Sequence, residues 1–149
     1  MRGRSIAVCA VLTACASGPP APAELDTRTE ACRSCRMAVS EARFAAQLVA
    51  RGEEPFFFDD LGCLRDFRRA NGGAPSRTAY VADHRTRQWV SAERAVYTRV
   101  PGLATPMGSQ LVAHADAPSR DLDPSVRGGS PVPVAEVLGA ASAAEGGRP

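Results

Sequence analysis

The sequence predicts an α+β fold in which two related β-β-α-β units form one small domain. Short segments with alternating apolar residues are separated by turn residues, which is typical of strands. A helical pattern begins after Asp59-Asp60 and stops at Asn71-Gly72-Gly73. The same order of strand, acidic helix start, Gly-Gly pair and returning strand occurs in Phe56–Val81 and, more faintly, in Leu111–Val134.

The first two segments predict a hairpin. Residues Cys35–Val39 alternate, so Cys35, Met37 and Val39 are expected on one face of a short strand. Arg43–Ala50 is also extended, and the polar residues between the two segments suit a turn.

The clearest helix follows a strand at Phe56–Phe58. Asp60 is a typical N-cap, because its side chain can accept a hydrogen bond from the exposed amides of the first turn. Leu61, Leu64 and Phe67 then recur at three-residue spacing, which predicts the buried face of the helix.

The second half of the chain repeats this order less regularly. Thr78–Asp83 predicts a strand, and Gln88–Val100 predicts an extended region that breaks near its middle. Ser109–His114 is again extended, and residues 116–127 are only weakly helical because two prolines interrupt them. Val132–Leu138 is expected to be the returning strand.

The N-terminus resembles a bacterial lipoprotein signal peptide over residues 1–15. Arg2 and Arg4 supply the charged region, and the apolar run that follows is too short to span a bilayer as a mature helix. Leu12-Thr13-Ala14-Cys15 resembles a lipobox, which predicts cleavage before Cys15 and acylation of that residue. We therefore expect a lipid anchor at Cys15 and a location on a bacterial membrane, facing the periplasm.

The remaining chain is expected to contain a flexible tether, one domain and a frayed tail. Prolines and small residues predict an unstructured tether at 16–30, the domain covers 31–138, and Ala and Gly dominate 139–149. Removal of Arg2 and Arg4 with the leader reduces the 18 basic residues to 16, which equals the 16 acidic residues. Nucleic acid is therefore not an expected partner.

Three cysteines remain in the mature domain out of the five in the chain. Cys9 leaves with the leader and Cys15 carries the anchor, so Cys32, Cys35 and Cys63 are left. An odd number of cysteines in an oxidising compartment argues against a framework built only of disulfides. At least one thiol therefore needs another explanation.

Sulfur ligands in close sequence predict a site for a soft metal ion. Cys32, Cys35 and Met37 lie within six residues, and thiolate and thioether ligands together favour Cu(I). Met107 lies between a proline and a glycine, where a bend would display its thioether away from the core. His114 is a weaker candidate ligand.

Cys63 is a further candidate thiolate. It falls three residues after Asp60, in the first turn of the predicted helix. Exposed amides and the helix dipole at that position favour a thiolate over a thiol. The alternative is that Cys63 packs as a small apolar residue.

Four motifs in this order resemble the NosL family of lipoprotein copper chaperones. They are Cys32-x-x-Cys35-x-Met37, Phe58-Asp59-Asp60-Leu61-Gly62-Cys63, Tyr80-Val81-Ala82-Asp83 with Trp89-Val90, and Thr105-Pro106-Met107-Gly108. The resemblance covers roughly Cys32–Leu138. It implies a compact fold of two β-β-α-β units, Cu(I) binding, and delivery of copper to periplasmic nitrous-oxide reductase through a membrane transporter complex. The prolines in the second predicted helix depart from the expected regularity.

Two other functions remain open at this point. A thiol-disulfide protein could use Cys32 and Cys35, although such a motif should open a helix and none is predicted at Cys35. A structural zinc site could use Cys32, Cys35, Cys63 and His84, although a thioether beside the thiols favours copper. No Ser-His-Asp arrangement, phosphate loop or carboxylate pair predicts an enzyme.

Overall fold

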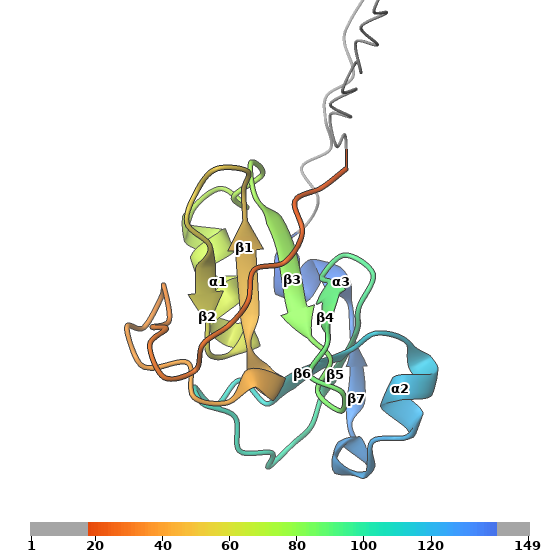
Figure 1. The fold of residues 1–149 in the computed structure, drawn as a ribbon. Coiled ribbons are helices and arrows are strands. Elements are labelled where there is room, and N and C mark those ends of the chain that lie inside the picture. The colour runs from red at the N-terminus through yellow and green to blue at the C-terminus, as the bar shows by residue number, and fades with distance from the viewer. Residues whose placement is uncertain (1–17, 140–149) are drawn as a thin grey trace, which may run out of the picture.

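The computed structural model describes residues 18–139, and Figure 1 shows the arrangement of their elements. The leader expected at 1–15 and the tail expected after Gly139 lie outside the described residues. No helix within 18–139 has the length and apolar character needed to cross a bilayer. In chain order the elements are η1 (Ala42–Phe44), β1 (Ala46–Val49), β2 (Phe56–Phe58), α1 (Leu61–Ala70), β3 (Thr78–Ala82), β4 (Trp89–Ser91), β5 (Val96–Arg99), β6 (Leu111–His114), α2 (Ala117–Asp121), η2 (Pro124–Val126), β7 (Ser130–Val132) and α3 (Val134–Leu138).

The structure confirms the α+β fold with two related β-β-α-β units. In the first sheet the strand order is β2-β1-β3-β4, and in the second it is β6-β5-β7, with antiparallel pairing throughout. Each unit therefore places its first strand in the centre, with the second and the last strand on either side of it. α1 connects β2 to β3, while α2 and η2 connect β6 to β7. A parallel bridge between Asp83 and Ala113 joins the two units.

Helix α1 forms where the sequence predicts it. The carboxylate of Asp60 accepts a hydrogen bond from the Gly62 amide at 2.6 Å and so caps the helix. At the other end the Gly73 amide donates to the Arg68 carbonyl at 2.7 Å, and Gly73 has a φ of 81°, a conformation that glycine adopts without a steric penalty. Asp60 therefore caps the N-terminus of α1, and Gly73 closes the turn that follows its C-terminus.

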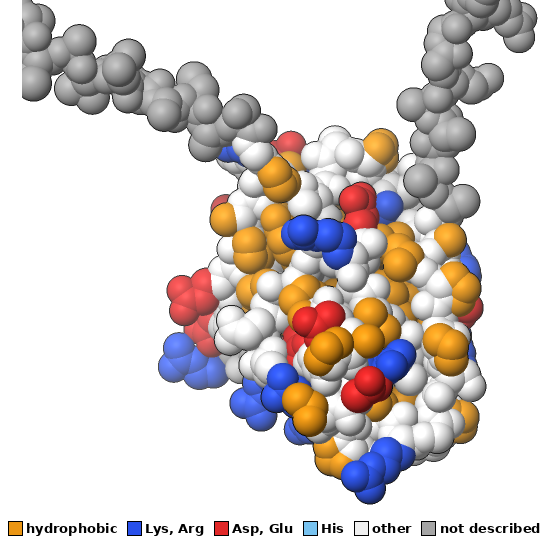
Figure 2. Space-filling model, turned by 90° about the vertical axis from the view of Figure 1, so that its right-hand side faces the viewer, with side chains coloured by type: hydrophobic (Ala, Val, Ile, Leu, Met, Phe, Trp, Pro, Cys, Tyr) orange, Lys and Arg blue, Asp and Glu red, His pale blue; other side chains and the backbone are white. Residues whose placement is uncertain are grey.

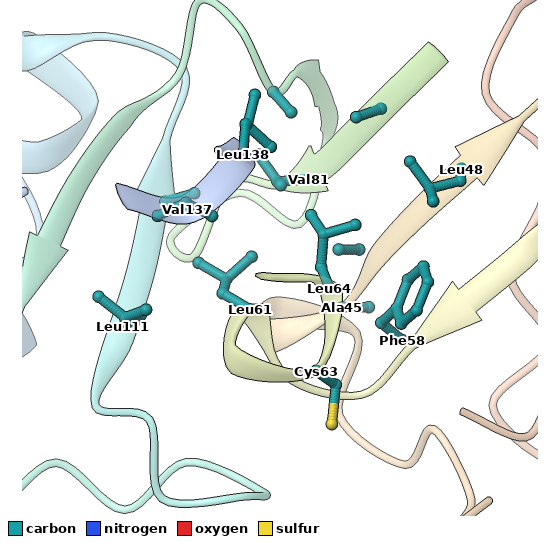
Figure 3. Packing of buried hydrophobic residues seen from close by; sticks show 14 of the residues in the cluster. Ala45, Leu48, Phe58, Leu61, Cys63, Leu64, Val81, Leu111, Val137 and Leu138 are labelled. Atoms are coloured by element: carbon teal, nitrogen blue, oxygen red, sulfur yellow. The ribbon is translucent and has the colours of Figure 1, made fainter. Parts of the chain in front are cut away.

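The core lies between the first sheet and helices α1 and α3. The outer surface near α2 carries both apolar and charged side chains. Figure 2 shows that face, with apolar side chains interspersed among charged ones and no histidine visible. Figure 3 shows Leu61 and Leu64 of α1 pointing toward Val81 of β3 and toward Val137 and Leu138 of α3. Burial of these aliphatic side chains fixes α1 against the sheet.

The strand expected at Cys35–Val39 is wrong. The chain turns instead: the Arg36 amide donates to the Cys32 carbonyl at 3.0 Å, Arg36 has a φ of 68°, and only an isolated bridge between Ala31 and Ala38 remains of the pairing. A residue with positive φ cannot continue a strand, so alternation in the sequence does not become a shared face. Val39 is buried, whereas Met37 is 58% exposed.

The returning strand expected at Val132–Leu138 is also corrected. Strand β7 ends at Val132, and Val134–Leu138 forms α3 instead. Pro133 lies between them with a φ of −62°, which suits the start of a helix, and its missing amide ends the strand pairing. The Arg68 guanidinium donates to the Leu138 carbonyl at 2.8 Å and ties α3 to α1.

The tether expected at 16–30 is not unstructured over its described part. Gln47 is fully buried, and its side chain accepts from the Ala23 amide at 2.8 Å and donates to the Ala23 carbonyl at 3.1 Å. The Tyr80 hydroxyl donates to the Pro20 carbonyl at 2.6 Å. Figure 1 shows this segment crossing the first sheet on the face opposite α1. Polar side chains on that face need partners, and the N-terminal backbone supplies them.

Candidate metal centre

Four ligand-type side chains from three parts of the chain converge at one end of α1. One atom from each of Cys32, Cys35, Asp59 and Cys63 lies within 4.8 Å of the others. The first two come from the turn that replaces the predicted strand, Asp59 follows β2, and Cys63 lies in the first turn of α1. The structure therefore brings together the three thiols that the sequence singles out.

The turn from Cys32 to Met37 is held by backbone hydrogen bonds. The Cys32 amide donates to the Met37 carbonyl at 2.7 Å, which closes the turn across its two ends. The Arg33 amide donates to the Phe57 carbonyl at 2.7 Å, which docks the turn on β2. Cys32 is fully buried and Cys35 is half-buried. One thiol therefore lies deep and the other nearer to solvent.

Helix α1 positions Cys63 through its cap and its apolar face. Asp60 fixes the start of the helix, and Leu61 and Leu64 anchor it in the core. Figure 3 shows the Cys63 side chain leaving the helix on the side away from Leu61 and Leu64. The thiol therefore faces the turn that carries the other two cysteines, as the short separation of the ligand atoms requires.

Asp59 belongs to the site, although its position in the sequence indicates only the start of a helix. It is 2% exposed, and the Cys35 thiol lies 3.6 Å from each of its carboxylate oxygens. Its position directly before the N-cap, at the end of a buried strand, is the signal that could have identified it. Asp59 is an acceptor for a thiol proton and contributes negative charge to the site.

Burial raises the pKa of the Cys63 thiol, and the neighbouring Cys32 and Asp59 raise it further. Burial likewise raises the pKa of Cys32. In the metal-free protein these effects favour a protonated Cys63, in contrast to the thiolate expected from its position at the start of the helix. A metal cation reverses this balance, since it replaces the thiol protons and neutralises the charge.

Both candidate methionines lie on the surface. Met37 is 58% exposed and Met107 is 46% exposed, and the backbone of one is bound to Cys32 and that of the other to the cap of α1. The Met37 carbonyl accepts from the Cys32 amide, and the Met107 amide donates to Asp60 Oδ2 at 2.9 Å. The bend at Met107 is closed by the Gly108 amide donating to the Thr105 carbonyl at 3.0 Å. Neither thioether fills the core.

Both histidines lie in a separate group. His84, His114 and Asp123 place one ligand atom each within 4.8 Å of one another, and all three are buried. His114 is therefore not placed with the thiols, and the zinc set of three cysteines with His84 is not assembled. The sequence could not show this grouping, because the parallel bridge between Asp83 and Ala113 creates it.

The donor set of the cluster suits a soft metal ion. Three thiols converge in this cluster, and soft sulfur ligands of this kind favour a soft metal ion such as copper over harder ions. The Cys32–Cys35 turn does not open a helix, which is the setting that a thioredoxin-like redox pair requires.

Comparison with known proteins identifies one related fold. No family model matches the chain, and no curated protein matches its sequence. Among solved structures, the crystal structure of the copper chaperone NosL from Shewanella denitrificans superimposes with a TM-score of 0.56 at 16% identity. The match covers 69% of this chain and 85% of that one. The fold is therefore NosL-like, as the sequence motifs indicated, and its structural neighbour is a metal carrier.

The carboxylate of Asp60 is predicted to stabilise the site in a pH-dependent way. Burial raises its pKa, but hydrogen bonds from Ser109, Met107, Thr105 and Gly62 outweigh this effect, so the pKa lies below 3.8. A lowered pKa stabilises the fold above the unfolded value, and this contribution disappears as the pH falls through the folded value. Asp60→Asn should therefore lower the free energy of unfolding by about 1–2 kcal/mol at pH 7, and the difference should shrink below about pH 4.

Urea denaturation at pH 7 and pH 3 measures this difference. Asp66→Asn is the matched control, because Asp66 is an exposed acid on the same helix. The control should change the free energy of unfolding by less than about 0.5 kcal/mol. An Asp60→Asn effect of equal size at both pH values would contradict the assigned role of the carboxylate.

Proposed function

We propose that this protein is a periplasmic, membrane-anchored chaperone that binds Cu(I) and delivers it to a copper enzyme. The convergence of Cys32, Cys35 and Cys63 in one cluster carries the proposal. The NosL-like fold supports it, since the structural neighbour is a copper chaperone.

The arrangement of sulfur atoms by depth suits a carrier. Met37 and Met107 at the surface meet the incoming ion first, and Cys35 is the half-buried thiol that follows. Cys32 and Cys63 then complete a soft site that shields Cu(I) from water. Release of the ion follows the reverse order. A ligand of the partner protein replaces the two outer thioethers first, and the deeper thiolates dissociate from the ion afterwards.

Asp59 assists the loading step by accepting protons. Burial raises the pKa of Cys32 and of Cys63, which favours the protonated thiol at both residues in the metal-free protein. Each thiol must lose its proton to bind the ion as a thiolate. Asp59 lies 3.6 Å from the Cys35 sulfur, where its carboxylate can accept the proton that this thiol loses. As a hard oxygen donor, Asp59 is not expected in the Cu(I) coordination shell.

The N-terminal contacts support an anchor close to the domain. The Tyr80 hydroxyl already binds the Pro20 carbonyl, and Pro20 follows Cys15 by five positions in the sequence. An extended chain spans at most about 3.6 Å per residue, so an acyl group on Cys15 would hold the domain within roughly 18 Å of the lipid surface. A short link of this kind favours transfer to a partner in the same membrane.

The client we propose is periplasmic nitrous-oxide reductase, reached through a membrane transporter complex. The four NosL-like motifs support this choice. Deletion of the gene for this chain should lower the copper content of the reductase while leaving its polypeptide level unchanged. A fully copper-loaded reductase in the deletion strain would contradict the client assignment without affecting the metal assignment.

Cu(I) selectivity tests the site directly. Reduced protein lacking residues 1–15 should bind about one Cu(I) per chain and prefer it strongly to Zn(II), because the donors are soft. Cys35→Ser should weaken Cu(I) binding with little loss of stability, since Cys35 is only half-buried. Competition with chelators of known strength measures both affinities. Equal or tighter retention of zinc would overturn the copper assignment.

The methionines are predicted to act through sulfur. Met37→Leu and Met107→Leu together should lower the affinity for Cu(I) or the rate of its transfer. The free energy of unfolding should change by less than about 1.5 kcal/mol, because leucine preserves size and hydrophobicity. Leu122→Ala is the control, because Leu122 is an apolar residue that is 69% exposed away from the thiols. Unchanged copper affinity and transfer in the double variant would show that the thioethers take no part.

The anchor is predicted to depend on Cys15. Cys15→Ser removes the thiol that a lipoprotein pathway acylates, so the variant should leave the membrane fraction or accumulate unprocessed. Cell fractionation and mass spectrometry of the N-terminus measure the outcome, with Cys9→Ser as the matched control in the leader. A Cys15→Ser protein that is still processed and membrane-bound would contradict the lipoprotein assignment.

A further inference from the structure

We propose that the chain binds a second metal ion, a divalent ion of borderline softness such as Zn(II) or Cu(II), through His84, His114 and Asp123. This site is independent of the thiol cluster. Asp123 Oδ2 lies 2.7 Å from His84 Nδ1 and 3.0 Å from His114 Nε2, so both imidazole rings point at the same carboxylate oxygen.

The fold brings the two histidines together through the contact between its units. His84 follows β3, and its amide donates to the Ala113 carbonyl at 2.8 Å, directly before His114 at the end of β6. Asp123 comes from the other side as the N-cap of η2, where the Ser125 amide and hydroxyl donate to its second oxygen. Backbone bonds therefore fix all three ligands before an ion arrives.

The cluster is buried, and its hydrogen bonding is incomplete. His114 is 0% exposed, Asp123 is 6% exposed and His84 is 7% exposed. Within residues 18–139, His84 Nε2 and His114 Nδ1 have no hydrogen-bond partner, and the other ring nitrogens share one carboxylate oxygen. Buried polar atoms without partners are costly. The nitrogens that face the carboxylate are His84 Nδ1 and His114 Nε2, and an ion bound there would replace the two contacts that now share one oxygen with coordination bonds.

The charge of the cluster also suits a cation. Asp123 Oδ2 lies between the two imidazole rings, and the other carboxylate oxygen is held by the Ser125 amide at 3.0 Å. A carboxylate oxygen therefore faces the position that a cation would take.

The donor types distinguish this site from the thiol cluster. Two imidazole nitrogens and one carboxylate oxygen suit Zn(II) and Cu(II), whereas thiolates and thioethers select Cu(I). Asp123 also lines a cavity of about 320 Å³, together with Thr98, Arg120 and Arg127, whereas neither histidine lines it. No histidine is visible on the α2 face in Figure 2, which agrees with the burial of both rings.

The test titrates Cu(I)-loaded protein with Co(II), Zn(II) and Cu(II) in turn. We expect one further divalent ion per chain, with a Co(II) visible spectrum of nitrogen and oxygen ligands and no thiolate-to-metal charge-transfer band. The relative affinities of Zn(II) and Cu(II) decide between the two ions. Absence of a second ion at millimolar metal, or a charge-transfer band from thiolate, would overturn the proposal.

Ligand variants locate the ion. Asp123→Asn and His114→Gln should each weaken divalent binding by more than about 100-fold, beyond the effect of losing an outer-shell partner, while Cu(I) affinity stays unchanged. Asp121→Asn is the matched control, because Asp121 is an exposed acid two residues away. Circular dichroism of each variant confirms folding, and the wild-type titration decides the question if a variant unfolds. Unchanged divalent affinity in a folded Asp123→Asn protein would overturn the assignment.

Discussion

The carboxylate of Asp60 is the interaction on which the thiol site depends. One oxygen accepts from the Gly62 amide at 2.6 Å and thereby starts the helix that carries Cys63. The other accepts from the Thr105 hydroxyl at 2.7 Å and from the Met107 amide at 2.9 Å, which holds the methionine bend against the same helix end. A single buried anion therefore links a thiol and a thioether that are far apart in the sequence.

Both β-β-α-β units contain an aspartate helix cap, but the residue three positions after the cap has a different role in each unit. In each unit an aspartate caps the helix after the second strand, Asp60 in α1 and Asp116 in α2. Three residues after the cap stands Cys63 in the first unit and Ser119 in the second. The Ser119 hydroxyl donates to Asp83 at 2.7 Å and serves the contact between units, whereas Cys63 faces the other thiols. A repeated scaffold thus gives one sulfur site and one structural junction.

Local chemistry explains which features could be predicted. Helix α1 was predictable because its cap, its apolar spacing and its Gly-Gly stop are all read over a dozen neighbouring residues. The turn at Cys32–Met37 was not, because Arg36 adopts a positive φ that its residue type does not favour, and docking on β2 stabilises it. The ordered contacts of Pro20 and Ala23 depend on Gln47 and Tyr80, which only the folded sheet brings beneath them.

The two candidate metal sites also combine features set by neighbouring residues with features set by contacts between distant parts of the chain. Thiols in a CxxC spacing are visible in the sequence, but Asp59 joins them only because β2 and the turn lie side by side. The group of His84, His114 and Asp123 arises from pairing between units.

X-ray absorption at the copper edge of the Cu(I)-loaded protein tests most directly whether sulfur ligands alone bind the copper ion. We expect a coordination shell of sulfur alone around the copper ion. Imidazole or oxygen ligands in place of sulfur would contradict the proposed thiol site.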